Sequence, residues 1–188
     1  MPESYCPSCG TPLQDRIVDH RTRRACPACG RIQWRNAKPC AGVLVIRNGK
    51  VLLVRRTVEP FLGYWDIPGG FCEVDEHPAE TAIREVREET GLEIELTGLL
   101  GLWLDEYVEH TTLNIYYLAR PLTRHLQIGD DAGAAAWFAP DALPPKIAFV
   151  NGRMALEAWA SDYSTPYICG APRKRRSLGL KPSSEFAV

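Results

Sequence analysis

The segment from Gly70 to Leu92 gives the strongest constraint on the fold, because it combines the start and stop signals of a helix with charged residues at helical spacing. Pro78 suits the first turn of a helix and Gly91 suits the position just past a helix end, so the segment predicts a helix from about Pro78 to Thr90. Apolar residues at helical spacing predict one stripe that packs against a core: Ala79, Ala82, Ile83 and Val86.

The same helix would carry three glutamates on one face. Glu85, Glu88 and Glu89 are spaced i, i+3 and i+4, which brings their carboxylates close enough to repel one another. A divalent cation such as Mg²⁺ would relieve that repulsion, because it prefers oxygen ligands and also grips substrate phosphates. The alternative without chemistry is an acidic helix face exposed to solvent.

Strand patterns lie on both sides of this helix. Two apolar runs flank Asn48-Gly49, which is a strong hairpin signal because both turn positions tolerate positive φ. A loop rich in Gly and Pro follows at 57–70, and further strands are predicted within 92–106, 111–122 and 134–143. A C-terminal helix is predicted from about Asn151.

Length and composition limit the number of folding units. With 188 residues, 45% hydrophobic and 24% charged, the chain can form one ordinary core and a small appendage, and it fits neither a disordered nor a fibrous class. No apolar run reaches the roughly 20 residues that cross a bilayer, and the polar N-terminal stretch lacks a signal-peptide pattern. The sequence therefore predicts a cytoplasmic protein with no membrane partner.

The net charge of −1 conceals an uneven distribution. Residues 1–40 carry seven basic against three acidic side chains, residues 41–170 carry ten against nineteen, and residues 171–188 carry five against one. The acidic middle suits a domain that concentrates divalent cations. The basic ends fit solvated surface, an anion-steering rim or a nucleic-acid contact, and charge alone does not choose among these.

Four of the seven cysteines form two Cys-x-x-Cys pairs, Cys6 with Cys9 and Cys26 with Cys29. Two such knuckles separated by sixteen residues predict a ribbon that holds one structural Zn²⁺ in a tetrahedron of thiolates. A redox-active pair is the competing interpretation, but it needs one motif on a helix of a thioredoxin-like unit. The remaining cysteines are expected to be buried or half-buried: Cys40, Cys72 and Cys169.

The segment 70–92 fits the pattern Gly-x5-Glu-x7-Arg-Glu-U-x-Glu-Glu-x-Gly-U, where U is apolar, at every fixed place. This pattern is the Nudix box, so the chain resembles the Nudix hydrolases over about residues 38–160, including the Trp-x-x-Pro-Gly-Gly lead-in from Trp65. The matching positions are Gly70, Glu76, Arg84, Glu85, Val86, Glu88, Glu89, Gly91 and Leu92. The resemblance implies an α+β fold, an α/β/α sandwich with a mixed β-sheet preceded by the small zinc ribbon.

The resemblance also implies a reaction, the hydrolysis of a nucleoside diphosphate linked to another group, with Mg²⁺ or Mn²⁺ and an attacking water. The implied metal ligands are the carboxylates of Glu85, Glu88 and Glu89 and the carbonyl of Gly70. Arg84 would orient these glutamates, and Glu76 would support them from behind. The general base stays open, because some members use a box glutamate and others a later carboxylate. The later candidates are Glu106, Glu109, Asp130 and Asp131.

Substrate preference is predicted from the region beyond the box. A zinc ribbon before a Nudix domain resembles the NADH pyrophosphatases, but their Ser-Gln-Pro-Trp-Pro-Phe-Pro signature is missing. The chain looks more like ADP-ribose or FAD pyrophosphatases, which would release AMP and a phosphorylated product, and NADH or NAD is the alternative. Candidate substrate residues are Arg55, Arg56, Tyr64, Trp65, Trp103, Glu106, Tyr107 and Phe149, although the aromatic ones are as well suited to core packing.

A function of a different class is a nucleic-acid-binding module built on the ribbon and the basic ends. The ribbon supplies charge and one aromatic ring: Arg21, Arg23, Arg24, Arg31, Arg35 and Trp34. We rank this below hydrolysis, since an inactive scaffold has no reason to keep every carboxylate of the box. The expected organisation is a zinc ribbon at 1–36, a Nudix domain at 37–165 and a basic tail at 166–188, assembled as a homodimer.

Overall fold

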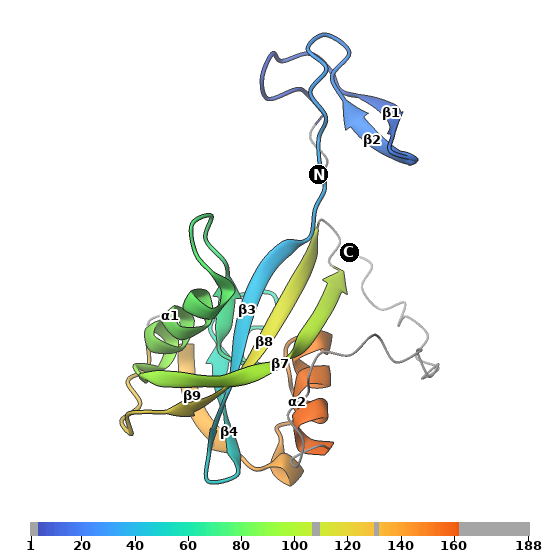
Figure 1. The fold of residues 1–188 in the computed structure, drawn as a ribbon. Coiled ribbons are helices and arrows are strands. Elements are labelled where there is room, and N and C mark those ends of the chain that lie inside the picture. Colours follow the sequence, from blue (N-terminus) through green and yellow to red (C-terminus); the bar gives the residue numbers. More distant parts are fainter. Residues whose placement is uncertain (1–3, 107–109, 130–131, 162–188) are drawn as a thin grey trace.

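The computed structural model describes residues 4–106, 110–129 and 132–161. Figure 1 shows two parts, a small N-terminal unit that we call the ribbon (residues 4–36) and a larger core unit that follows it. The ribbon contains two antiparallel strands, β1 (Gln14–Val18) and β2 (Arg21–Ala25). The predicted basic tail and Cys169 lie outside the described residues, and the three domain bounds stay a prediction.

The core unit contains a seven-stranded sheet, a short 3-10 helix and two α-helices. Its elements are β3 (Lys38–Arg47), β4 (Lys50–Arg56), β5 (Trp65–Asp66), β6 (Gly69–Phe71), α1 (Pro78–Thr90), β7 (Ile94–Glu106), β8 (Thr111–Pro121), β9 (Ala132–Phe138), η1 (Pro140–Ala142) and α2 (Val150–Ser161). The strand order is β5-β4-β3-β8-β7, with β6 also paired to β3 and β9 to β4. Among the strands of the described residues, only β3 and β8 pair in parallel, so the sheet is mixed, as predicted.

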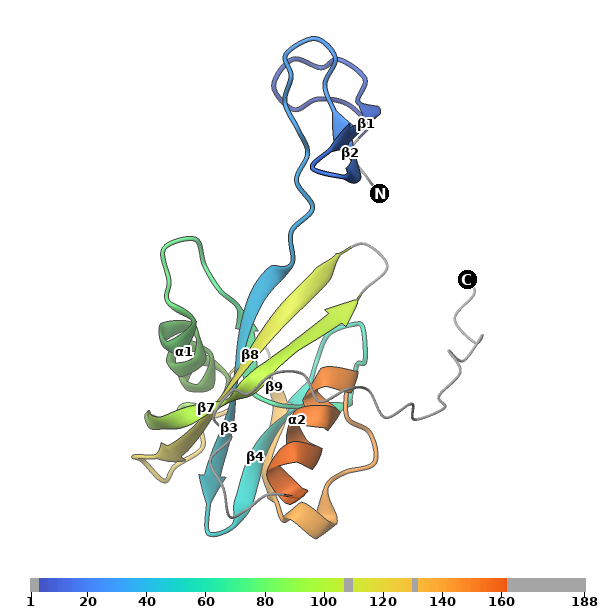
Figure 2. The same ribbon diagram turned by 45° about the vertical axis from the view of Figure 1, so that its right-hand side comes forward.

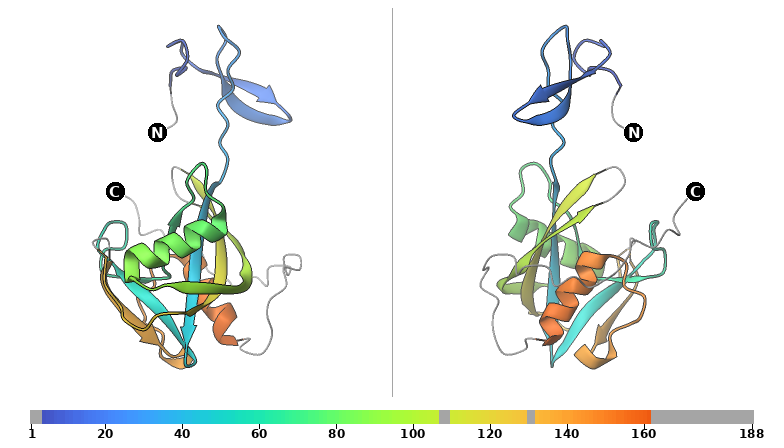
Figure 3. Two further views of the ribbon diagram at one scale, coloured as in Figure 1. Left: turned by 60° about the vertical axis from the view of Figure 1, so that its left-hand side comes forward. Right: turned by 90° about the vertical axis from the view of Figure 1, so that its right-hand side faces the viewer.

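The two α-helices cover opposite faces of the sheet (Figure 3), and the side chains of β3 explain why. Leu44 packs in one cluster with Leu156 of α2, whereas its neighbours Val43 and Val45 pack in a second cluster with Val86 of α1. Successive strand residues point to opposite faces, so a strand covered on both sides is apolar throughout. Each such fully buried side chain contributes about 1.5–3 kcal/mol. The predicted α/β/α sandwich is confirmed.

The hairpin predicted at Asn48-Gly49 joins β3 to β4, and both residues adopt positive φ, 51° and 73°. The two strands then diverge. They pair only at their ends nearest the turn, Ile46 with Val51 and Arg47 with Lys50. Beyond that point β3 pairs with β6 and β8, while β4 pairs with β5 and β9, which gives the V-shaped arrangement in Figure 2. The sheet is therefore forked beside the start of β3.

Helix α1 has the predicted bounds, and Gly91 ends it in the left-handed conformation with φ 68°. The buried stripe differs in part from the prediction, because Ile83 is 36% exposed whereas Thr81 and Thr90 are fully buried beside Ala82. Burial of the two threonines is possible because each hydroxyl has a partner, Glu76 for Thr81 and the Val86 carbonyl for Thr90. The predicted C-terminal helix begins at Val150.

Within the described ranges, the helices are all too short or too polar to cross a membrane.

Gly69 should not tolerate a side chain, because it lies in β6 directly opposite Gly42 of β3. A Cβ at Gly69 would come within 2.6 Å of the Gly42 Cα and would also meet the Ala41 carbonyl. We expect Gly69→Ala to lower the free energy of unfolding by about 1–3 kcal/mol, since backbone atoms cannot give way cheaply. Gly98→Ala on β7, where a Cβ would meet nothing within 4 Å, is the matched control and should change stability by less than about 0.5 kcal/mol. Urea unfolding followed by tryptophan fluorescence measures both.

Candidate active site and cysteine cluster

The face of α1 that carries the glutamates packs against β6, where glycine allows a close approach. A Cβ at Gly70 would lie 2.6 Å from the carboxyl carbon of Glu85, so a side chain at this position would displace the carboxylate from the strand. Gly69 donates its backbone N–H to Oε2 of Glu89 at 3.2 Å. The Pro-Gly-Gly sequence before the box therefore brings the backbone of β6 into direct contact with two of the three predicted metal ligands.

Arg84 is the main positive charge within this group of carboxylates. Its Nε and Nη2 atoms donate to the two oxygens of Glu76 at 2.8 and 2.9 Å, a bidentate pair. Its Nη1 atom donates to Glu85 at 2.8 Å and to Glu88 at 3.0 Å. The hydrogen bonds from Arg84 lower the pKa of Glu76 to about 2. The structure thus brings together Arg84, Glu76 and two of the predicted ligands.

The carboxylates nearest to β6 are the most buried and the most difficult to ionise. Burial and the neighbouring Glu85 and Asp66 carboxylates raise the pKa of Glu89 to about 8. Burial also raises the pKa of Glu85, although Arg84 opposes that effect. Glu88 is the outer member, with its side chain 54% exposed. Carboxylates outnumber the single guanidinium at this surface, and this arrangement suits the binding of a cation.

A cavity of about 430 Å³ lies at the fork in the sheet, directly beside Gly69 and Gly70. Its wall combines two positive charges, four aromatic or imidazole rings and two acids: Lys38, Arg56, Phe71, His110, Tyr116, Phe149, Glu59 and the buried Asp66. Lys38 lies 5.9 Å from the centroid of the Phe71 ring, and the Arg56 guanidinium lies 4.9 Å from that of Phe149. The cavity thus offers two separate places where a cation stands over an aromatic ring.

Asp66 is a polar residue of this cavity that the sequence analysis missed. Its Oδ1 atom accepts the Ile67 N–H at 2.9 Å, and its Oδ2 atom lies 3.4 Å from Arg56. Burial raises the pKa of Asp66 to about 7, although Arg56 opposes the shift. Asn151, buried at the start of α2, lies on the same wall. The signal for Asp66 was available, because a charged residue between Trp65 and Ile67 interrupts an apolar stretch that leads into the box.

The predicted substrate residues fall into two groups. Arg56 and Phe149 line the cavity, whereas Arg55 is exposed and donates to the Gly63 carbonyl. Trp65 packs edge-on against Phe138 at 4.9 Å and belongs to the core around α2.

Two further aromatic candidates do not line the cavity themselves and pack against other side chains. Trp103 packs against the Tyr116 ring at 5.5 Å, so it supports a cavity residue from behind. Tyr64 lies between Phe61 and Lys146. Contact with neighbouring side chains accounts for the positions of Trp103 and Tyr64, and a substrate role for them stays a prediction.

A box glutamate or a later carboxylate was predicted as the general base, and the one later candidate among the described residues does not line the cavity. Glu106 ends β7 and is exposed. Glu109, Asp130 and Asp131, together with Tyr107, lie outside the described residues. The identity of the base therefore stays open.

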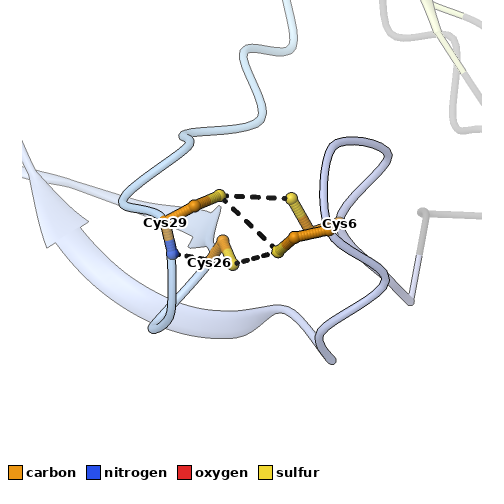
Figure 4. Close-up of side chains that lie close together, drawn as sticks. Cys6, Cys26 and Cys29 are labelled. Carbon is orange, nitrogen blue, oxygen red and sulfur yellow. Dashed lines mark hydrogen bonds between the residues drawn. The ribbon is translucent and has the colours of Figure 1, made fainter.

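The four paired cysteines converge in the ribbon, and Figure 4 labels three of them, Cys6, Cys26 and Cys29. Sulfur–sulfur distances are 3.6 Å from Cys6 to Cys29, 3.5 Å from Cys9 to Cys26 and 3.7 Å from Cys9 to Cys29, and all four sulfurs lie within 4.8 Å of one another. Four thiolates at about 2.3 Å from a tetrahedral Zn²⁺ ion would stand roughly 3.8 Å apart, so the donor set fits that metal. Among the described residues this is the one such cluster of ligand atoms, because Glu85 and Glu88 turn toward Arg84 instead.

The other two described cysteines, Cys40 and Cys72, are half-buried, as expected.

Both the ribbon and the core unit match known protein families. The family model described as NUDIX domain matches residues 37–158, and the one described as Nudix N-terminal matches residues 4–34. An ADP-ribose pyrophosphatase of Methanocaldococcus jannaschii is 35% identical over 56% of this chain and 63% of its own length. The NAD-capped RNA hydrolase NudC of Pseudomonas aeruginosa is 33% identical over 75% of this chain and 49% of its own length. The chain thus spans about half to two thirds of these relatives.

Solved structures agree with this assignment. A NUDIX hydrolase from Nitrosomonas europaea has a TM-score of 0.77 and 25% identity, covering 87% of this chain and 95% of that one. An ADP-ribose pyrophosphatase from Streptococcus suis has a TM-score of 0.59 and 26% identity, covering 70% of this chain and 96% of that one. With the box on α1, the forked sheet and the four-cysteine ribbon in place, the chain belongs to the Nudix hydrolase family and carries that family's N-terminal zinc ribbon.

Proposed function

We propose that this chain hydrolyses the pyrophosphate bond of a nucleoside diphosphate derivative with the help of Mg²⁺ or Mn²⁺. ADP-ribose or FAD is the favoured substrate, and AMP and a phosphorylated product are released. The observation that carries the proposal is the contact between the Arg84-bound carboxylates of α1 and the strand β6, whose residues Gly69 and Gly70 also line the cavity. An acidic surface and a cavity that holds two cation–aromatic pairs meet at that strand.

The proposed metal ligands are the carboxylates of Glu85, Glu88 and Glu89 and the carbonyl of Gly70. When bound, the ion neutralises phosphate charge and makes a water molecule more acidic. Arg84 is a positioning residue, because its hydrogen bonds hold Glu85 and Glu88 on one side of the helix. Glu76 fixes Arg84 in turn by accepting two hydrogen bonds from it. The Gly69 N–H holds Glu89 toward the cavity side of the helix.

The cavity supports a substrate with a group on each side of its diphosphate. Lys38 with Phe71 and Arg56 with Phe149 offer two cation–aromatic pairs, one near the start of β3 and one near the start of α2. Each pair suits a phosphate-bearing ring system, since the ring can stack while the cation neutralises charge. Binding both halves positions the bond between them, which a simple triphosphate cannot exploit equally.

Two named relatives frame the choice of substrate. The name of one refers to ADP-ribose, and that of the other refers to NAD-capped RNA. The missing NADH signature after the box favours ADP-ribose or FAD, and NADH or NAD remains the alternative. We also propose a structural Zn²⁺ in the ribbon and a homodimer. The edge strand β7 exposes Leu102 and Leu104, an apolar edge that a second copy would cover.

The substrate proposal is tested by steady-state kinetics on ADP-ribose, FAD, NADH and nucleoside triphosphates, with products identified by chromatography. We expect kcat/KM for ADP-ribose or FAD to exceed that for NADH, with AMP as one product. Triphosphates should be poor substrates. A clear preference for NADH, or for a triphosphate with release of pyrophosphate, would contradict the proposal.

Glu88→Gln should lower kcat by at least about a hundredfold while changing stability by less than about 0.5 kcal/mol. The substitution removes the negative charge of a proposed metal ligand, which should weaken metal binding and lower turnover. The side chain is exposed, so its packing contributes little to stability. Glu93→Gln, an exposed carboxylate just after the box, is the matched control and should keep wild-type kcat. Near wild-type turnover of Glu88→Gln at saturating Mg²⁺ would defeat the ligand assignment.

Glu76→Gln should destabilise the protein near neutral pH, and the difference from wild type should shrink in acid. The folded-state pKa of Glu76 is lowered from 4.5 to about 2 by Arg84, so its ionised form stabilises the fold above about pH 4.5. That stabilisation is lost as the pH falls from 4.5 toward 2. Urea unfolding at several pH values measures the difference, with the exposed Glu157→Gln on α2 as the control. A difference that stays constant from pH 6 to pH 3 would rule out the Glu76–Arg84 pair as its cause.

The ribbon should contain one zinc per chain, bound by Cys6, Cys9, Cys26 and Cys29. A unit with so small an apolar core needs the free energy of metal binding in order to fold. Elemental analysis of the purified protein should therefore give one zinc, and the double variant Cys26→Ser, Cys29→Ser should lose it. Full zinc content in that variant would disprove the site, and the half-buried Cys72→Ser is the control that should retain zinc.

A further inference from the structure

Arg56, the last residue of β4, is held at the cavity wall by three contacts. Its Nε atom donates to the Pro60 carbonyl at 3.0 Å, and its Nη1 atom lies 3.4 Å from Oδ2 of Asp66. Its guanidinium also lies 4.9 Å from the centroid of the Phe149 ring. The hydrogen bonds that Arg56 makes to the described residues use Nε and Nη1, so Nη2 remains available for a ligand in the cavity.

Asp66 is fixed in turn by strand pairing and by the backbone. It stands opposite Val54 of β4, and because side chains alternate along a strand, Asp66 lies on the same side of the sheet as Arg56. Its Oδ1 atom accepts the Ile67 N–H at 2.9 Å, which leaves Oδ2 directed at Arg56. The side chains of Arg56 and Asp66 are only 19% and 14% exposed. The sheet therefore sets the position of Asp66, and Asp66 sets the direction of Arg56.

The contact between Asp66 and Arg56 directs the guanidinium without satisfying it. Charge-assisted hydrogen bonds are typically about 2.7–2.9 Å long. Arg84 and Glu76 meet that standard at 2.8 Å, whereas the atoms of Arg56 and Asp66 are 3.4 Å apart. A buried ion pair gains little net stability, because both charges lose their water. The contact therefore matters more for the orientation of Arg56 than for the stability of the fold.

The pair also lies close to the proposed metal ligands. Gly69, which donates its N–H to Glu89, lines the same cavity as Arg56 and Asp66. Besides burial, the charges of Asp66 and Arg56 both act on Glu89, the first raising its pKa and the second lowering it. A diphosphate bound to a cation at Glu89 would therefore lie within reach of Arg56. A planar guanidinium with free N–H groups matches the geometry of phosphate oxygens.

We propose that Asp66 is a positioning residue, which holds Arg56 in the orientation that binds the diphosphate of the substrate. The inference rests on the proposed function and adds to it a residue that acts through Arg56. The expected sign of its effect is distinctive. A carboxylate near a phosphate repels it, so neutralising Asp66 would strengthen diphosphate binding if charge were its only effect. Loss of the orientation of Arg56 would weaken binding instead.

Asp66→Asn tests this sign, because an amide has one oxygen where the carboxylate has two. That oxygen can accept from the Ile67 N–H or from Arg56, but not fully from both, and the amide nitrogen accepts from neither. Binding is measured by titration calorimetry with Mg²⁺ and α,β-methylene-ADP, a nucleoside diphosphate whose P–C–P bridge resists hydrolysis. We expect Kd to rise about tenfold in Asp66→Asn and in Arg56→Ala.

A double-mutant cycle shows whether Asp66 acts through Arg56. In the Arg56→Ala background, Asp66→Asn should change Kd by less than about twofold, because the group that it positions is already gone. Glu95→Gln, which breaks an exposed carboxylate–arginine pair between β7 and β8, is the matched control and should keep the wild-type Kd. Tighter binding by Asp66→Asn, or a full tenfold effect of it in the Arg56→Ala background, would overturn the proposal.

Steady-state kinetics with ADP-ribose separate positioning from direct chemistry. A phosphate contact that exists before and during the reaction affects KM more than kcat. Asp66→Asn should therefore raise KM about tenfold, lower kcat by less than about threefold and keep the shape of the pH profile of kcat. If Asp66 were the general base, the substitution would lower kcat by far more and abolish the acidic limb of that profile. That result would contradict a positioning role.

The orientation of Arg56 is measured without any substrate by NMR relaxation of its side-chain Nε–H group, assigned with Arg56→Lys. We expect an order parameter above about 0.6 in ligand-free wild type and below that value in Asp66→Asn. A mobile Arg56 in wild type would overturn the proposal whether or not the variant folds.

The two kinds of measurement separate this inference from the proposed function. If Arg56 is ordered by Asp66 and binds α,β-methylene-ADP, but none of the tested substrates is hydrolysed, the proposed reaction is wrong and the positioning role stands. If ADP-ribose is hydrolysed while Asp66→Asn changes neither Kd nor the order of Arg56, the positioning role is wrong and the hydrolase stands.

Discussion

Arg84 neutralises part of the negative charge that Glu76 and the glutamates of α1 bring together. Glu76, Glu85 and Glu88 lie close together, and a buried carboxylate without a partner costs several kcal/mol. The guanidinium group of Arg84 donates to all three, and it also donates to the Phe71 carbonyl at 3.3 Å. One side chain therefore makes the acidic face stable and ties α1 to β6. The glutamates retain excess negative charge, which is what a divalent cation requires.

The fork in the sheet determines where that acidic face meets a ligand. Strand β3 is covered on both sides by α1 and α2, so it stays in the centre, while β4 leaves it after two residue pairs. The opening beside β6 becomes the cavity, with Lys38 at one end and Arg56 with Phe149 at another. In the proposed reaction, these walls bind the two halves of the substrate and α1 supplies the ligands between them.

Local features of the sequence predicted local features of the structure well. The bounds of α1, the Asn48-Gly49 turn and the convergence of the cysteine pairs depend on residues near one another in the chain, so their spacing carries the information. The cavity wall was predicted poorly because it combines residues from β3, β4, β6, β8 and the start of α2. Trp65 and Trp103 were predicted as candidate substrate residues from their residue type. Their rings pack against Phe138 and Tyr116, which the residue type alone does not indicate. Ile83 was wrongly predicted to be buried. The buried face of α1 includes two threonines instead, because the hydroxyl of each has a hydrogen-bond partner.

In the proposed reaction, the carboxylates around Arg84 bind the catalytic cation at the edge of the cavity. Anomalous X-ray scattering from crystals grown with Mn²⁺ tests it most directly, because the method locates the ion independently of activity. We expect a manganese peak coordinated by Glu85, Glu88 and Glu89 and the Gly70 carbonyl, beside Gly69 and the cavity. A fully occupied manganese site elsewhere, with the carboxylates still bonded only to Arg84, would contradict it.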